Sequence, residues 1–192
     1  MEHVTVKDLV LGSGGVLVSG SEEAPVSHIR LDSRQVEPGD LFVPLLGERV
    51  DSHRFLPQVM DQGAAAVLTS QELTLPEGGA GCAVIRVEDT KKALQKIGSY
   101  LRDRLTLPLV GVTGSVGKTT TREMIAAALS ARFRVYKTPG NSNSQVGVPV
   151  TLSEITENDQ VGVIELGMSE PGEMTVIANI ARVDMAVITN IG

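Results

Sequence analysis

A glycine-rich loop at 113–120, with the sequence TGSVGKTT, limits the possible folds of this chain more than any other feature. It follows the apolar run 109–112, which is typical of a buried strand, and precedes a segment at 118–131 whose apolar residues recur with helical spacing. In such a unit, glycines let backbone N–H groups turn inward, and the helix N-terminus adds unpaired donors and its positive dipole end. The sequence therefore predicts a loop that binds the phosphates of a nucleoside triphosphate.

Two side chains of this loop and one acidic residue complete the predicted site. Lys118 is expected to contact the β and γ phosphates, and Thr119 to place its hydroxyl on Mg²⁺. Such sites also need a carboxylate at the end of a neighbouring strand, and Glu165 closes an apolar run. The usual pattern G-x-x-x-x-G-K-[ST] has glycine where this chain has Val112, and we expect Gly114 to serve in its place. The simpler alternatives are a glycine turn beside a surface lysine and an exposed glutamate at a strand end.

Strand and helix patterns alternate from 108 to the end of the chain. We expect strands at 109–112, 133–137, 161–166 and 184–190, and helices at 118–131, near 145–154 and at 172–182. This order predicts a parallel sheet flanked by helices. Four strands are fewer than a doubly wound domain usually has, so we expect 108–192 to be a partial ATP-binding central domain. Its apolar sheet edge should favour self-association of the chain.

The first half of the chain has shorter elements. We expect strands at 16–18, 28–31, 40–45, 65–68 and 83–87, and short helices that begin near Thr5 and Phe55. Apolar residues at 94, 97, 101 and 105 lie on one helix face, so 86–107 is expected to be a connecting helix or linker. The predicted fold class is α/β, with a small mixed α/β N-terminal domain at 1–85 followed by an incomplete P-loop-type parallel-sheet domain.

Composition and charge exclude several functions. The net charge of −6 and an aromatic content of 3%, with no tryptophan, argue against a nucleic-acid partner, which needs clustered Lys and Arg or stacking rings. We find no run of 18 apolar residues and no signal peptide, so no membrane span is expected and the predicted location is the cytoplasm. The single cysteine, Cys82, suits a reducing compartment, and we interpret it as a small strand residue.

Several longer motifs resemble one enzyme family. In the second half these are TGSVGKTT at 113–120, KTPGNSN at 137–143, GVP at 147–149, ELGMS at 165–169 and ITNIG at 188–192. In the first half they are DSR at 32–34, PGDLFV at 38–43 and GERVDSH at 47–53. Together they resemble the Mur ligases of peptidoglycan synthesis. The element ELGMS, followed by PGEM at 171–174, is most similar to the members that add D-alanyl-D-alanine.

The resemblance implies an ATP-dependent amide ligase with Mg²⁺ as a cofactor. ATP would phosphorylate the C-terminal carboxylate of a UDP-N-acetylmuramoyl tripeptide, and the amine of D-Ala-D-Ala would attack the acyl phosphate. The residues implied in ATP binding are Thr113, Gly114, Ser115, Val116, Gly117, Lys118, Thr119 and Thr120. Those implied in catalysis are Lys118 and Glu165, and those implied in metal binding are Thr119 and Glu165. Those implied in substrate binding are Asp32, Ser33, Arg34, Arg49, His53, Asn141 and Asn143.

Other interpretations stay open at the level of sequence. Residues 32–33 could form only a turn, and residues 51–52 only a helix cap. The chain could belong to a ligase of the same family with a different amino-acid substrate, or it could be a non-catalytic nucleotide-binding module. A small-molecule kinase is disfavoured because the four arginines after the loop do not cluster as a lid. Because the central domain is expected to be partial, we also expect these 192 residues to be inactive by themselves.

Overall fold

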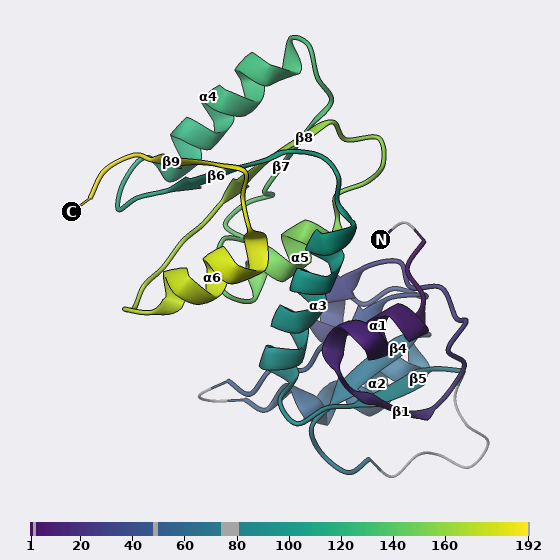
Figure 1. Ribbon diagram of the computed structural model, residues 1–192. Helices are drawn as coiled ribbons and strands as arrows, with labels where there is room; N and C mark the ends of the chain where they lie inside the picture. The colour runs from purple at the N-terminus through teal and green to yellow at the C-terminus, as the bar shows by residue number, and fades with distance from the viewer. Residues whose placement is uncertain (2, 48–49, 74–80, 192) are drawn as a thin grey trace. The chain divides into compact units, whose positions relative to one another are not determined.

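The computed structural model describes residues 1, 3–47, 50–73 and 81–191, and Figure 1 shows its course. The chain divides into two compact units, Met1–Ile97 and Gly98–Gly192. The boundary falls inside helix α3 (Thr90–Arg104), in the segment for which the sequence predicts a connecting helix. In the described part of the chain, no helix has both the length and the apolar character that a membrane crossing requires.

The first unit is built on a mixed sheet. Among the described residues, five strands take the order β1-β5-β4-β3-β2. They are β1 (Val16–Ser19), β2 (Ile29–Arg30), β3 (Leu41–Phe42), β4 (Ala66–Thr69) and β5 (Ala83–Arg86). Strands β2 to β5 run parallel to their neighbours, and β1 pairs with β5 in the antiparallel direction. Phe42, Val67 and Val84 of this sheet pack against Leu56 of helix α2 (Leu56–Asp61) in one apolar core.

Aspartate and threonine residues start the short helical elements of the first unit. The backbone N–H of Thr5 donates to the Asp8 carboxylate at 2.9 Å, which begins helix α1 (Val6–Ser13) as the sequence predicts. Asp32 and Asp51 accept the N–H groups of Arg34 and His53. These contacts begin the 3₁₀ turns η1 (Ser33–Gln35) and η2 (Ser52–Phe55). The turn at 32–33 and the cap at 51–52 are therefore both present.

The second unit is a parallel sheet between helices. Within 98–191 the strand order is β7-β8-β6-β9. The strands are β6 (Leu109–Thr113), β7 (Val135–Lys137), β8 (Val161–Glu165) and β9 (Met185–Ile188). The helices are α4 (Lys118–Ser130), α5 (Gly147–Ser153) and α6 (Glu173–Ala181). Figure 1 shows α4 on one face of this sheet and α5 and α6 on the other, and a separate apolar cluster lies on each face. The parallel sheet flanked by helices is as the sequence predicts.

Strand β7 is shorter than the sequence predicts. The expected strand starts at 133, but the observed one starts at Val135. The N–H groups of Arg132 and Phe133 both donate to the Leu129 carbonyl, at 3.0 and 2.9 Å. These bonds complete the last turn of α4, so the two residues are not available to the sheet. The apolar pattern of the segment could not distinguish a helix end from a strand start.

The end of α3 is tied to the starts of two strands in the second unit. Arg102 donates through Nε to the Ala181 carbonyl at 2.9 Å and through Nη2 to Asp184 Oδ2 at 3.1 Å. The same Oδ2 atom accepts the backbone N–H of Leu109, the first residue of β6, at 2.8 Å. Asp184 immediately precedes β9, so one carboxylate fixes where both β6 and β9 begin.

Strand β9 lies at one edge of the parallel sheet. It pairs with β6 on one side, and no strand in the described part of the chain pairs with its other side. Its apolar side chains are largely exposed, with 54% of Met185 and 59% of Ile188 accessible. The sheet therefore has the apolar edge that the sequence predicts.

Candidate nucleotide-binding site

Two glycines give the loop between β6 and α4 its shape. Gly114 has a φ of 134° and Gly117 a φ of 82°, both in a region that favours glycine. A Cβ atom at Gly114 would lie 2.1 Å from Oγ1 of Thr189. Gly117 is the N-cap of α4. The loop thus depends on glycine at 114 and 117, although the usual pattern has one at 112.

The segment after β9 lies against this loop. Asn190 accepts through Oδ1 from the Ser115 hydroxyl at 2.9 Å and from the Val116 N–H at 3.0 Å. Thr189 donates its hydroxyl to the carbonyls of Thr113 and Val116. The sequence contains this segment as a motif but gives it no role. Because β6 and β9 are parallel neighbours, their C-terminal ends meet at the same edge of the sheet.

A pocket of about 490 Å³ opens beside the loop. Its lining consists of Ser115, Val116, Gly117, Lys118, Thr119, Thr120, Asn141, Asn143 and Glu165. Lys118 folds back across the loop, and its Nζ donates to the Gly114 carbonyl at 2.7 Å. The fold therefore gathers one lysine, two asparagines and one carboxylate around the first turn of α4.

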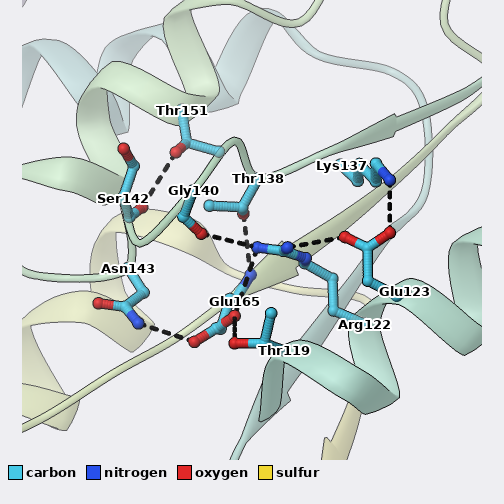
Figure 2. Close-up of polar contacts among 10 residues, drawn as sticks. All are labelled: Thr119, Arg122, Glu123, Lys137, Thr138, Gly140, Ser142, Asn143, Thr151 and Glu165. Carbon is cyan, nitrogen blue, oxygen red and sulfur yellow. Dashed lines mark hydrogen bonds and ion pairs between the residues drawn. The ribbon is translucent and has the colours of Figure 1, made fainter.

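Glu165 lies at the end of β8 and faces the start of α4, as Figure 2 shows. Its side chain is buried, with 2% of the residue exposed, so it is not an exposed strand-end glutamate. Oε2 accepts the Thr119 hydroxyl at 3.0 Å, and Oε1 accepts Nδ2 of Asn143 at 2.8 Å. The Glu165 backbone N–H donates to the Thr138 hydroxyl at 2.9 Å. Burial of a carboxylate is costly without hydrogen-bond donors, so Thr119 and Asn143 stabilise the Glu165 side chain in this position.

The geometry of Thr119 and Glu165 fits a magnesium ion. Two adjacent ligands of an octahedral Mg²⁺ at about 2.1 Å lie about 3.0 Å apart, which is the spacing of Thr119 Oγ1 and Glu165 Oε2. Among the described residues, no group of three or more His, Cys, Asp and Glu side chains is arranged to hold a metal. Mg²⁺ usually takes one or two protein ligands and completes its shell with phosphate oxygens and water, so two oxygen ligands suffice.

The loop after β7 carries the asparagines into the pocket. The Asn143 carbonyl accepts the Gly167 N–H at 2.8 Å, and the Thr151 hydroxyl donates to the Ser142 carbonyl at 3.1 Å. A Cβ atom at Gly167 would lie 2.8 Å from Cγ of Asn143, so the strand end and the loop approach each other closely. Asn141 also lines the pocket.

Arg122 is a residue of this site that the sequence interpretation missed. It lies on α4 and is 5% exposed. Its Nη1 donates to the Gly140 carbonyl at 3.0 Å and lies 3.4 Å from Glu165 Oε2, and its Nη2 donates to Glu123 at 2.7 Å (Figure 2). Its spacing of four from Lys118 and three from Thr119, which puts the three on one side of a helix, was the available signal.

The predicted substrate residues of the first unit occupy two local clusters. Asp32 is paired with the exposed Arg34, whose side chain and backbone hydrogen bonds lower the pKa of Asp32 to about 2. Ser33 between them is buried. Arg49 lies outside the described residues.

The second cluster surrounds His53, which is buried. Its Nδ1 lies 2.6 Å from Asp51 Oδ1, and its Nε2 accepts the Ser70 backbone N–H at 3.2 Å. The backbone N–H of His53 is the largest cause that lowers the pKa of Asp51. Gln71 donates to the other oxygen of Asp51 at 2.7 Å and lines a cavity of about 290 Å³. His53 therefore fastens its loop to the end of β4 through Nε2, while Nδ1 pairs with Asp51 of the same loop.

Comparison with known protein families assigns both halves of the chain. The Mur ligase middle domain matches residues 112–192, and the Mur ligase family catalytic domain matches residues 25–101. The chain belongs to the Mur ligase family. The resemblance that the motifs indicate is confirmed.

Among curated Mur ligases, the UDP-N-acetylmuramoyl-tripeptide–D-alanyl-D-alanine ligase of Bacillus subtilis is 42% identical over 189 residues. This match covers 98% of the chain and 41% of the relative. The ligase of the same name from Synechocystis is 43% identical over 173 residues, which cover 90% of the chain and 37% of the relative. The chain thus spans about two fifths of the length of these relatives.

Solved structures similar to this chain come from the same family as the curated relatives. A crystal structure of MurF from Acinetobacter baumannii matches with a TM-score of 0.88 and 35% identity, over 98% of this chain and 41% of that one. A MurF ligase structure from Thermotoga maritima, determined in complex with ADP, matches with a TM-score of 0.76 and 32% identity. That match covers 87% of this chain and 38% of the other. The α/β fold predicted from the sequence is confirmed.

Proposed function

We propose that this Mur ligase chain is part of an enzyme that adds D-alanyl-D-alanine to a UDP-N-acetylmuramoyl tripeptide at the expense of ATP. The second unit is the ATP-binding part of a central domain, and the first unit binds the uridine nucleotide of the substrate. The observation that carries the proposal is the pocket in which Lys118, Thr119, Asn143 and Glu165 meet. The names of the relatives from Bacillus subtilis and Synechocystis support the choice of substrates.

ATP is bound by the loop at 113–120. Lys118 exchanges its bond to the Gly114 carbonyl for contacts with the β and γ phosphates, and the N-terminus of α4 adds further N–H donors. The Thermotoga maritima relative was determined in complex with ADP, which supports an adenine nucleotide as a ligand. The cytoplasm is the proposed location, since ATP and uridine nucleotides are available there.

Mg²⁺ is the second cofactor, and Thr119 and Glu165 are its proposed protein ligands. When bound, the ion reduces the repulsion between the γ phosphate and the anionic carboxylate that attacks it. The tripeptide carboxylate takes the phosphoryl group, and ADP leaves. The amine of D-Ala-D-Ala then attacks the acyl phosphate, and inorganic phosphate leaves. Asn141 and Asn143 lie between the two reactants in this proposal.

The uridine nucleotide is assigned to the first unit, with Asp32, Ser33, Arg34 and Arg49 as the proposed contacts. His53 contributes by holding its loop, because both of its ring nitrogens have partners inside the unit. These 192 residues alone are proposed to bind nucleotide without ligating. The pocket beside the phosphate loop is open, so an acyl phosphate formed there would be exposed to water.

Titration of the 192-residue chain with MgATP tests the nucleotide assignment. We expect saturable binding that Lys118→Ala abolishes, whereas Lys7→Ala, an exposed lysine on α1, leaves it unchanged. Equal binding by wild type and Lys118→Ala would overturn the assignment. For the substrate, ADP release by the full-length ligase that contains this chain is measured with D-Ala-D-Ala and with single amino acids. A preference for a single amino acid would replace the proposed substrate.

A further inference from the structure

Arg122 is a buried charge at the point where three elements of the second unit meet. It projects from α4 toward the end of β8 and toward the loop after β7, as Figure 2 shows. Nη1 is closer to the Gly140 carbonyl, at 3.0 Å, than to Glu165 Oε2, at 3.4 Å. The nearest donor to Glu165 Oε2 is therefore the Thr119 hydroxyl, at 3.0 Å. Arg122 holds the loop firmly and leaves that oxygen directed toward Thr119.

The burial of this guanidinium is costly. Among the described residues, its Nε is a buried atom without a hydrogen-bond partner. An unsatisfied buried polar atom destabilises a protein, and a buried ion pair is often no more stabilising than apolar packing of the same volume. Stability alone therefore does not account for an arginine here. Its Nη1 carries two N–H donors and lies within hydrogen-bond distance of two acceptors from different parts of the chain, Gly140 and Glu165, while Nη2 is held by Glu123.

We propose that Arg122 is a positioning residue for the metal-bound nucleotide. It holds the Glu165 carboxylate beside Thr119, and through Gly140 it holds the loop that carries Asn141 and Asn143 against α4. This inference rests on the proposed function, because it concerns the same nucleotide and Mg²⁺ site. Arg122 itself does not line the pocket in which the nucleotide is proposed to bind.

The arrangement separates two contributions to nucleotide binding. In the proposed function, Lys118 and the loop N–H groups contact the phosphates whether or not Mg²⁺ is present. Lys118 lines the pocket, and Arg122 does not. Thr119 and Glu165 contribute only through the cation. Loss of Arg122 should therefore weaken the Mg²⁺-dependent part of the affinity and leave the Mg²⁺-free part nearly unchanged. A general loss of structure would reduce both.

The test measures ADP binding to the 192-residue chain with Mg²⁺ and with EDTA. Variants are Arg122→Met, which removes the donors, and Arg122→Lys, which keeps one charged donor. Residues that orient metal ligands typically contribute about 10- to 100-fold in metal affinity, so we expect a loss of about tenfold or more in Mg²⁺-dependent binding for Arg122→Met. Arg122→Lys should recover only part of this loss, because a single ammonium lacks the fixed fork of donors.

Arg132→Met is the matched control. It makes the same change at an exposed arginine just after α4, whose guanidinium lies over the Phe133 ring and does not line the pocket. We expect wild-type behaviour with and without Mg²⁺. If Arg122→Met fails to fold, the comparison of Arg122→Lys with wild type decides the question.

The outcomes distinguish this inference from the function on which it rests. A wild-type chain that binds no ADP under either condition would overturn the proposed function. Wild-type binding that Arg122→Met leaves unchanged, or weakens equally with Mg²⁺ and with EDTA, would overturn the positioning role alone. Complete recovery by Arg122→Lys would do the same, because charge without geometry would then suffice.

Discussion

Thr119 and Glu165 meet through one hydrogen bond although 46 residues separate them. In the proposed site the Thr119 hydroxyl turns from Glu165 to the cation. Thr119→Val keeps the shape of the side chain but removes this oxygen and leaves Glu165 Oε2 with one donor fewer. The missing donor is felt with or without the cation, so the effect on affinity comes from the lost metal ligand. Residues of a metal site typically contribute about 10- to 100-fold in metal affinity, so we expect MgADP binding to weaken by about tenfold or more. Thr119→Ser should bind like wild type, and equal loss in both variants would contradict a role for the hydroxyl.

The raised pKa of Cys82 predicts that this thiol reacts slowly in the folded chain. Burial in the core of the first unit raises the pKa of its thiol to about 11. At pH 8 the reactive thiolate should therefore be about 100-fold scarcer than for an unburied cysteine. A thiol reagent such as DTNB should label the folded chain at least that much more slowly than the chain in urea. Because the sequence has one cysteine, the signal has one source. Similar rates in both states would show that the first unit opens readily.

The same shift makes stability depend on pH. The folded thiol keeps its proton at a pH where the unfolded thiol has lost it, so the unfolded state binds fewer protons above about pH 9. The contribution of Cys82 to the free energy of unfolding should be constant below that pH and decrease toward about pH 11. Cys82→Ala should not show this decrease.

Residues with a local signature could be predicted, and residues with distant partners could not. Lys118 and Thr119 follow directly from the loop, and Glu165 from its place at a strand end. Arg122 was overlooked because its partners, Gly140 and Glu165, approach it only after β7 and β8 have paired. The burial of His53 was equally hidden, since its partner Ser70 lies 17 residues away.

At the scale of elements, the strand-loop-helix unit depends on one close contact. Gly114→Ala would place a methyl group 2.1 Å from Thr189 Oγ1 and would also strain the backbone at a positive φ. Strain of this kind costs about 1–3 kcal/mol. The variant loop must take on this strain to reach the shape that binds nucleotide, so the affinity should fall by about 5- to 150-fold. Gly81→Ala is the control, because no atom lies within 4 Å of a Cβ there. Unchanged binding by Gly114→Ala would mean that the loop can shift away from β9 freely.

The register of β6 against β9 depends on Asp184, whose carboxylate accepts the Leu109 N–H. Asp184→Ala leaves the buried Leu109 N–H without its side-chain acceptor, so the free energy of unfolding should fall by about 1–3 kcal/mol. The ion pair with Arg102 adds little to this figure, because half of the Asp184 side chain is exposed. Asp184→Asn keeps an acceptor oxygen and should lose less. Urea denaturation compares the two, and equal losses would assign the effect to charge.

Helices and strands could be predicted from the sequence where capping or turn residues mark their ends. Helix α1 begins next to Thr5 as predicted, and in the structure the Thr5 N–H donates to the Asp8 carboxylate. Strand β7 begins later than predicted because an apolar run does not show whether its N–H groups will bond to the preceding helix or to a neighbouring strand. The sheet order β7-β8-β6-β9 was not predicted, since a pattern of alternating strands and helices is compatible with several orders.

At the scale of the molecule, each unit matches its own part of the Mur ligase family, at 25–101 and at 112–192. The exposed β9 edge makes a prediction for these 192 residues. An unpaired apolar edge is a template for another strand, so light scattering should show an apparent mass that rises with concentration. Replacing Met185 and Ile188 with lysine should keep the chain monomeric. A wild-type chain that is monomeric at every concentration would contradict this prediction.

The contact between Asn190 and the phosphate loop lowers the gain in free energy when a nucleotide binds, because one loop N–H is already hydrogen-bonded. The Val116 amide proton already has a partner in Asn190 Oδ1, at 3.0 Å. In the proposed function, a phosphate oxygen therefore displaces a carboxamide, and only the difference between the two bonds adds to the affinity. Because this amide is hydrogen-bonded before and after binding, its deuterium exchange should change little when the nucleotide binds. The released carboxamide of Asn190 would instead give the spectroscopic signal of an occupied loop.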